Sequence, residues 1–167
     1  PMIHANLFAG EENSGKLVTL VRREAKAIAQ AQGYPIVIAD GSPGVGCPVM
    51  ASLTGADLAL LVTEPTPSGL HDLDRVAQLL QRFRIPGMVY TNKADLNLEL
   101  TEKIERYAAE RGMQVVGRMP YTSAVTAAQT VGLSVIEYSD NEAADSLRAI
   151  WKQVLARLQL DLTVQTR

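Results

Sequence analysis

The sequence predicts an α/β fold built on a mostly parallel sheet with helices on both faces. Short apolar runs rich in β-branched residues alternate with longer segments whose apolar residues recur every three or four positions. The first pattern is typical of strands buried on both faces, and the second of amphipathic helices. Their alternation along the chain favours parallel strands that are joined by helices.

The predicted elements cover the chain without a repeat, a low-complexity tract or an evident linker, so residues 1–167 are expected to form one domain. Strands are predicted at residues 2–8, 35–39, 57–63, 88–91 and 114–117. Helices are predicted at residues 16–29, 47–53, 70–84, 98–111, 125–130 and 141–158. Trp151 lies on the apolar face of the last helix and is expected in the core.

The composition excludes several classes of protein. A hydrophobic content of 47% with 20% charged residues is that of an ordinary folded domain. A net charge of −2 gives no general attraction to nucleic acid. One cysteine excludes an intrachain disulfide and an all-cysteine metal site, so no iron–sulfur cluster is expected in this chain. Because neither a secretory signal nor a membrane-spanning run is visible, a cytoplasmic protein is expected.

The stretch from residue 35 to residue 46 joins a predicted strand to an acidic, glycine-rich turn. Asp40 ends the strand, and Gly41, Pro43, Gly44 and Gly46 follow it. A carboxylate in this place suits Mg²⁺, and glycines let backbone N–H groups approach a phosphate. The alternative is an ordinary strand end that is capped by Asp40, and these residues alone do not decide between the two.

A second candidate phosphate loop precedes the first predicted helix. Residues 10–16 match the pattern G-x-x-x-x-G-K, but Leu17 occupies the place of the Ser or Thr that binds Mg²⁺. Glu11 and Glu12 would also repel a triphosphate. The alternative is a helix N-terminus that is capped by Asn13 or Ser14.

Polar residues also mark the ends of later strands. Asp40, Glu64 and Asn92 each follow an apolar run, and ligands of parallel sheets bind beyond the carboxyl ends of the strands. Residues 92–95 match the N-K-x-D element that reads guanine in GTP-binding proteins. However, Pro43 stands where the guanine-type switch has glycine. Asn92 could therefore contact guanine or the base of another nucleotide.

Three further residues have simpler explanations than catalysis. His71 lies in the polar first turn of a helix, and neither His71 nor His4 has partners at metal-ligand spacing. Cys47 begins a predicted helix, where a structural or partner-facing role is favoured over a nucleophile.

Five blocks in order, at residues 10–18, 40–48, 51–57, 63–73 and 92–95, resemble the MinD-type P-loop ATPases that carry an inserted ferredoxin domain. These belong to the superfamily of MinD, ParA, Mrp and cobyrinic acid a,c-diamide synthase. The resemblance covers nearly the whole chain. It implies a P-loop NTPase-like sheet of seven or eight mostly parallel strands that binds ATP and Mg²⁺, commonly as a homodimer.

The resemblance also assigns roles to residues. Asp40 matches the acidic residue of the Walker B motif, with a catalytic and Mg²⁺-holding role. Gly44 matches the switch that senses the γ-phosphate, Asn92 the adenine contact, and Pro120 with Tyr121 the loop that lines the base. The cofactor-binding set implied in this way comprises Gly41, Pro43, Gly44, Asn92, Asp95, Pro120 and Tyr121.

The chain departs from the family because the first strand, the Walker A loop and the cysteine-rich insert have no counterpart in it. It is therefore similar to the part of such an ATPase that follows the insert. The expected function is ATP binding, linked to an iron–sulfur or ferredoxin-type protein partner, without hydrolysis by this chain alone. A non-enzymatic interaction module and a GTP-binding protein are the alternatives. Without the first strand, a dimer or a rearranged sheet is expected.

Overall fold

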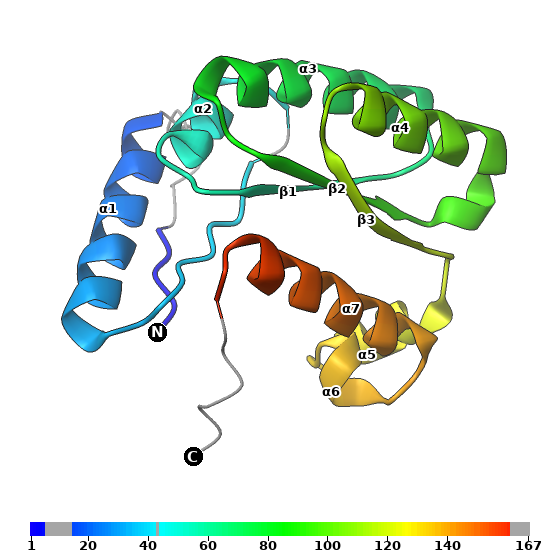
Figure 1. Ribbon diagram of the computed structural model, residues 1–167. Coiled ribbons are helices and arrows are strands. Elements are labelled where there is room, and N and C mark those ends of the chain that lie inside the picture. The colour runs from blue at the N-terminus through cyan, green and yellow to red at the C-terminus, as the bar shows by residue number, and fades with distance from the viewer. Residues whose placement is uncertain (6–14, 43, 161–167) are drawn as a thin grey trace, which may run out of the picture.

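A parallel sheet of three strands forms the centre of the protein (Figure 1). The computed structural model describes residues 1–5, 15–42 and 44–160. The strands are β1 (Ala59–Thr63), β2 (Gly87–Asn92) and β3 (Gln114–Met119), and they lie side by side in this order. β2 is the central strand, and four of its six residues are buried. All three strands end at the same edge of the sheet because they run in the same direction.

Helices cover both faces of the sheet, as the sequence predicts. Figure 1 shows α3 (Pro67–Phe83) and α4 (Leu98–Glu110) over one face. It shows α5 (Ser123–Thr130), α6 (Val135–Tyr138) and α7 (Glu142–Arg157) over the other. Each face has its own apolar core: Leu80, Val89 and Ile104 belong to the first, and Met88 and Ile150 to the second.

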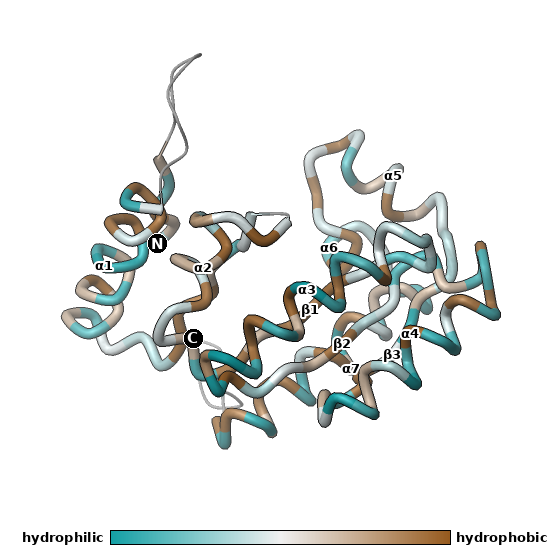
Figure 2. Tube along the Cα trace, turned by 90° about the horizontal axis from the view of Figure 1, so that it is seen from above, coloured by the Kyte–Doolittle hydropathy of each residue, from teal (hydrophilic) through white to brown (hydrophobic). Residues whose placement is uncertain are grey.

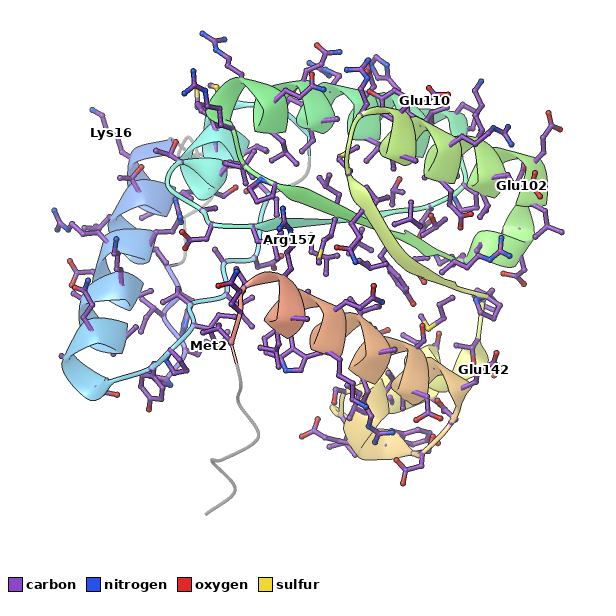
Figure 3. The ribbon with its side chains drawn as sticks, viewed as in Figure 1. Met2, Lys16, Glu102, Glu110, Glu142 and Arg157 are labelled. Carbon is purple, nitrogen blue, oxygen red and sulfur yellow. The ribbon has the colours of Figure 1, made fainter. Side chains whose placement is uncertain are left out.

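The surface helices are amphipathic, which explains why they pack in this way. Figure 2 shows hydrophobic and hydrophilic residues alternating along α3 and α4. In Figure 3 the side chains of Glu102 and Glu110 extend outward from α4. Ile104 of the same helix is completely buried. An apolar stripe that recurs every three to four residues therefore faces the sheet, and the charged residues face solvent.

The ends of α3 show how local sequence sets its length. The Thr66 hydroxyl accepts a hydrogen bond from Gly69 N at 2.9 Å, and Pro67 occupies the first turn, where its missing N–H costs nothing. The helix ends at Phe83, and the residue after it, Arg84, adopts a left-handed backbone with φ of 57°.

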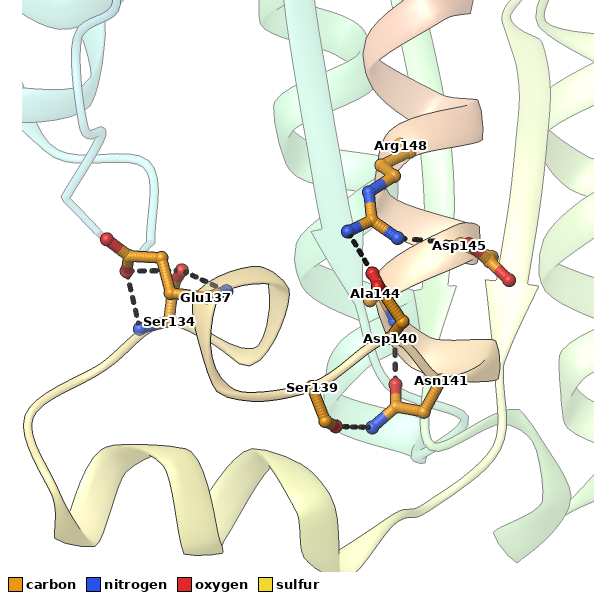
Figure 4. Close-up of polar contacts among 8 residues, drawn as sticks. All are labelled: Ser134, Glu137, Ser139, Asp140, Asn141, Ala144, Asp145 and Arg148. Carbon is orange, nitrogen blue, oxygen red and sulfur yellow. Dashed lines mark hydrogen bonds and ion pairs between the residues drawn. The ribbon is translucent and has the colours of Figure 1, made fainter.

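Capping interactions also set the corner between α6 and α7, which Figure 4 shows. Ser134 and Glu137 form a reciprocal capping box on α6, and Asn141 Oδ1 accepts from Ala144 N at 2.9 Å to start α7. Arg148 bonds Asp140 at 2.6 Å across this corner. The last helix therefore begins at a defined place against the sheet.

The first two helices pack on each other at one side of the sheet, and Val49 and Leu53 of the second join the apolar core beneath α3. α1 (Gly15–Gln32) packs on α2 (Cys47–Leu53), and Figure 1 shows α1 standing away from the strands. Arg22 Nη1 donates to Ala51 O at 2.8 Å and to Thr54 O at 2.5 Å. These bonds join the side of α1 to the end of α2.

The predicted strand at residues 35–39 does not form, and this prediction is wrong. The segment has no regular secondary structure, and the side chains of Val37 and Ile38 are 44% and 73% exposed. A strand needs a neighbour for its backbone hydrogen bonds, and within the described ranges no residue pairs with this segment. In the described residues the sheet accordingly has three strands, and not the seven or eight that the resemblance implies.

Smaller differences from the predictions concern the ends of the chain. Residues 2–5 have no regular structure, and residues 6–8 of the predicted first strand lie outside the described residues. Trp151 is 37% exposed, so its predicted core position is wrong. The helix α6 and the 3-10 helix η1 (Ala94–Leu96) were not predicted, because each is too short for a periodic apolar pattern.

Candidate functional site

The carboxyl edge of the sheet brings together residues that follow all three strands. Glu64 follows β1, Asn92 ends β2, and Pro120 and Tyr121 follow β3. Asn92 is half-buried, whereas the ring of Tyr121 is 57% exposed. A polar amide and an accessible aromatic ring therefore lie on neighbouring strand ends, which is the position where parallel sheets bind ligands.

Asp95 holds two of these strand ends together. Its Oδ1 accepts a hydrogen bond from Tyr121 N at 2.6 Å. Asp95 lies in η1, and Thr101 supports that turn by donating its hydroxyl hydrogen to Ala94 O at 2.8 Å. The loop that carries Pro120 and Tyr121 is thus fixed relative to the loop that carries Asn92.

An ion pair joins the end of β1 to the end of β2. Lys93 Nζ lies 2.7 Å from Glu64 Oε1, and Lys93 N donates to Asn92 Oδ1 at 3.0 Å. Lys93 adopts a left-handed backbone with φ of 53°, which turns the chain sharply after β2. The hydrogen bond from Lys93 N fixes the orientation of the Asn92 side chain and leaves its amide nitrogen as the donor toward a ligand.

Thr91 contributes an unusual feature directly beneath this edge. Its side chain is 1% exposed, and its Oγ1 has no hydrogen-bond partner among the described residues. A buried hydroxyl without a partner costs free energy. The sequence contains no signal for this feature, because Thr91 continues the β-branched pattern of the strand.

No family model matches the sequence. Solved structures, however, match the fold. The cell-division protein MinD of Aquifex aeolicus superposes with a TM-score of 0.67 at 17% identity, covering 86% of this chain and 61% of that one. MinD of Pyrococcus horikoshii, solved in complex with Mg-ADP, gives a TM-score of 0.68 at 16% identity and covers 89% of this chain and 60% of that one.

The chain has the MinD-type fold. It is also similar in sequence to several proteins. An uncharacterized protein of Methanocaldococcus jannaschii, MJ0578, is 36% identical over 97 residues, which cover 58% of this chain and 34% of that protein. The iron–sulfur cluster carrier protein of Pyrococcus abyssi is 23% identical over 159 residues, which cover 87% of this chain and 53% of that protein.

These likenesses confirm the resemblance to the MinD, ParA and Mrp superfamily that the sequence blocks indicate. The chain spans about a third to a half of the length of these relatives. Within the described part of the chain, no helix is long and apolar enough to cross a membrane.

The residues that the resemblance assigns to the phosphate side do not lie on a strand of the described sheet. Asp40 and Gly41 are exposed in the irregular segment that follows α1, and Gly44 follows in a bend with φ of 86°. Pro43 and residues 10–14 lie outside the described residues. No hydrogen bond or ion pair involving Asp40 is present in the described ranges, so its predicted metal and catalytic roles remain predictions.

The described residues do not by themselves form a complete binding site for Mg²⁺. No group of three or more His, Cys, Asp or Glu side chains converges anywhere in the part of the chain that the structure covers. Mg²⁺ takes six oxygen ligands, and Asp40 would supply one. A metal at this place would need phosphate oxygens and further ligands from elsewhere.

Sequence reasoning missed the pairing of Glu64 with Lys93. Both residues were recognised separately, Glu64 as a strand end and Lys93 as a part of the N-K-x-D element. Their contact follows from the adjacency of β1 and β2, in which Thr63 is level with Thr91. A known strand order would have revealed it, since the residues after two adjacent parallel strands lie side by side.

Proposed function

We propose that this chain is the base-binding part of an adenine nucleotide site in a MinD-type ATPase. Asn92 would contact the edge of the base, and Tyr121 would cover its face beside Pro120. The observation that carries the proposal is the hydrogen bond from Tyr121 N to Asp95, because it fixes the aromatic loop beside the strand end that presents Asn92. An aromatic ring and an amide donor together suit a planar heterocycle.

The MinD of Pyrococcus horikoshii, which shares the fold, was solved with Mg-ADP and supports the choice of nucleotide. Charge also favours the base over the phosphates at this edge. Glu64 neutralises Lys93, so the described edge offers no free cation from this pair to a triphosphate. We infer that the phosphates would be held by polypeptide other than this strand edge, and that this chain alone does not hydrolyse ATP.

Calorimetric titration with adenosine, Mg-ATP and Mg-GTP tests the proposal. We expect weak binding of adenosine and Mg-ATP with similar affinity, weaker binding of Mg-GTP, and no phosphate release. Similar affinities are expected because the phosphates would add few contacts. Turnover by the chain alone, a preference for Mg-GTP, or failure of every nucleotide to bind at millimolar concentration would contradict the proposal.

Two variants locate the binding. Tyr121→Ala should abolish the adenosine signal, and Asn92→Ala should weaken it at least tenfold. Tyr34→Ala is the matched control, since Tyr34 is also half-exposed, at 48%, and precedes the segment at residues 35–39. An equal loss in all three variants would show a general effect on folding.

The partner is proposed from the relatives. Three Pyrococcus relatives are named iron–sulfur cluster carrier proteins, and we propose an iron–sulfur or ferredoxin-type protein as the partner of this chain. We further propose that nucleotide binding favours a homodimer. Light scattering with and without Mg-ATP tests the dimer, and a mass that does not change with nucleotide would contradict it.

A further inference from the structure

A cavity of about 410 Å³ lies at the edge of the sheet where the strands begin, opposite the edge that carries Asn92. Gly87 begins β2 and Met113 directly precedes β3, and both residues line the cavity. Figure 1 shows α3, α4 and α7 running back toward this edge. The volume of the cavity lies within the range of small-molecule binding sites.

Three arginines from three different elements line this cavity, and none of the described residues that line it is acidic. Arg84 directly follows α3, Arg111 directly follows α4, and Arg157 is the last residue of α7. The whole chain has a net charge of −2, so this local excess of positive charge is not a general property of the chain. Like charges around one cavity repel one another, and a bound anion offsets that repulsion.

Two of the three guanidinium groups are available to a ligand. Arg84 and Arg157 are exposed, and neither forms an ion pair with any residue that the structure describes. Arg111 is held in place instead. Its Nη2 lies 3.3 Å from Asp74 Oδ1, and its guanidinium group lies 5.0 Å from the centre of the Tyr107 ring. The cavity thus combines one positioned cation with two that are free to close on a ligand.

The floor of the cavity is apolar and closely packed. Ala77, Leu80 and Met113 line it, and their side chains are at most 8% exposed. A Cβ on Gly87 would lie 3.0 Å from Leu80 Cδ1 and 3.0 Å from Met113 Sδ, so a side chain at the start of β2 would crowd this floor. An apolar floor below a cationic rim suits an organic anion, because the carbon skeleton and the charged oxygens find separate surroundings.

Arginines near the end of a helix can also serve the helix itself, because its last carbonyl groups carry a partial negative charge. In α3 and α4, however, backbone N–H groups already bond such carbonyls. Ile85 N donates to Leu80 O at 2.9 Å, and Met113 N donates to Ala108 O at 2.9 Å. The ends of these helices therefore do not require the arginine side chains as caps.

We propose that this cavity binds a small organic polyanion, whose negative oxygens pair with Arg84, Arg111 and Arg157 and whose carbon skeleton lies on the apolar floor. A guanidinium group donates two parallel hydrogen bonds to a carboxylate or to a phosphate, so both groups fit the rim. A polycarboxylate and a phosphate ester are the two sources of this chemistry. The site is separate from the proposed nucleotide site, which lies at the opposite edge of the sheet.

NMR titration of the ¹⁵N-labelled chain tests this proposal. The probes are citrate and pyrophosphate, each added without Mg²⁺, and sodium chloride keeps the ionic strength constant. We expect at least one probe to shift the side-chain Nε–H signals of Arg84, Arg111 and Arg157, with saturation at millimolar concentration or below. The signals of the Asn92 side-chain amide and the Tyr121 backbone amide should not move. Tighter binding of citrate would identify a carboxylate ligand, and tighter binding of pyrophosphate a phosphate ligand.

Two variants and a matched control locate the binding. Arg84→Gln and Arg157→Gln each remove a charge from the rim and should weaken binding of the probe at least fivefold. Arg106→Gln removes the same charge from α4, but Arg106 pairs with Glu102 and does not line the cavity, so the affinity should not change. Because all three arginines are exposed, the backbone signals away from each substitution should stay in place, which shows that the variants fold.

Three results would overturn the proposal. No shift with either probe would mean that the arginines serve only the helix ends. Equal weakening in Arg106→Gln would show a general attraction between charges. Shifts confined to Asn92 and Tyr121 would place the anion at the carboxyl edge. The same signals separate this site from the nucleotide proposal, because they assign any contribution of the triphosphate of Mg-ATP to one edge or the other.

Discussion

Asp95 Oδ1 accepts a hydrogen bond from the backbone N–H of Tyr121 at 2.6 Å, across 26 positions of sequence. The bond joins the loop after β2 to the loop after β3. Carboxylate acceptors make shorter and stronger hydrogen bonds with backbone N–H groups than neutral acceptors do. This contact decides whether the aromatic ring of Tyr121 and the amide of Asn92 keep a constant separation.

Replacing Asp95 by alanine should loosen the candidate site more than it destabilises the fold. Because Asp95 is exposed, loss of the bond should cost about 1 kcal/mol in the free energy of unfolding, measured in urea. Adenosine binding should fall at least fivefold. Asp95→Asn keeps an acceptor oxygen and should recover most of the binding, and an Asp95→Asn variant as impaired as Asp95→Ala would contradict the positioning role.

Gly69 should not tolerate a side chain. A Cβ at this position would collide with the carbonyl oxygen of Glu64 and would lie 2.9 Å from Thr63 Oγ1. Since the Glu64 oxygen belongs to the backbone of the turn before α3, relief requires the turn to move. Gly69→Ala should therefore destabilise the protein by about 1–3 kcal/mol in urea unfolding.

Gly46 provides the matched control for that substitution. A Cβ there would meet Pro48 Cδ at 3.5 Å, which is ordinary contact, and the backbone has φ of −70°. Gly46→Ala should change the free energy of unfolding by less than about 0.5 kcal/mol. If the two variants were equally stable, the close approach at Gly69 would not be a constraint.

The longer helices and three of the strands could be predicted from the sequence because they depend on local patterns. The predicted helix at residues 47–53 matches α2, and the strand at 88–91 lies within β2. The strand at 35–39 has an equally strong apolar pattern and did not form. Its pattern states only that the segment can be buried, whereas pairing depends on a neighbour that the described residues do not provide.

The candidate site was predictable to the extent that it lies at strand ends. The sequence predicts Glu64 and Asn92 at strand ends, and the structure places them there. Pro120 and Tyr121, which only the resemblance singles out, follow β3 at the same edge. The ion pair between Glu64 and Lys93 and the unpaired hydroxyl of Thr91 depend on strand order and tertiary packing. Asp40 was expected at this edge because it follows the predicted strand at residues 35–39. That strand does not form, so the predicted role of Asp40 remains a prediction.

A contact between α3 and α4 should make stability depend on pH at both extremes. The Tyr107 hydroxyl donates to Asp74 Oδ1, and Arg111 lies 3.3 Å from the same oxygen. Burial and this hydrogen bond raise the pKa of Tyr107 to about 12, and the Tyr107 hydrogen bond lowers the pKa of Asp74 below its usual value.

The signs of the two effects differ. The raised pKa of Tyr107 gives stability that is complete below pH 10 and is lost as the pH rises toward about 12. The lowered pKa of Asp74 gives stability that is present above pH 3.8 and is lost as the pH falls below it. Tyr107→Phe should therefore reduce both pH-dependent changes of the melting temperature. Identical profiles for the variant and the parent would contradict the coupling. Burial also raises the pKa of Tyr90. Because Tyr90 is present in both the variant and the parent, its contribution cancels when the two pH profiles are compared.

Thr91 and Thr101 offer a paired test of buried hydroxyl groups, since both side chains are almost completely buried on neighbouring elements. The Thr91 hydroxyl has no partner in the described residues, whereas the Thr101 hydroxyl donates to Ala94 O at 2.8 Å.

Valine has nearly the same shape as threonine. Thr91→Val should stabilise the protein by about 1 kcal/mol because it removes an unpaired polar group, and Thr101→Val should destabilise it by about 1–3 kcal/mol because it leaves the Ala94 carbonyl unpaired. Urea unfolding of both variants measures the two changes. Destabilisation by Thr91→Val would contradict this prediction. It would mean that the Thr91 hydroxyl has a hydrogen-bond partner in solution, such as a buried water molecule, and that this bond stabilises β2 beneath the candidate site.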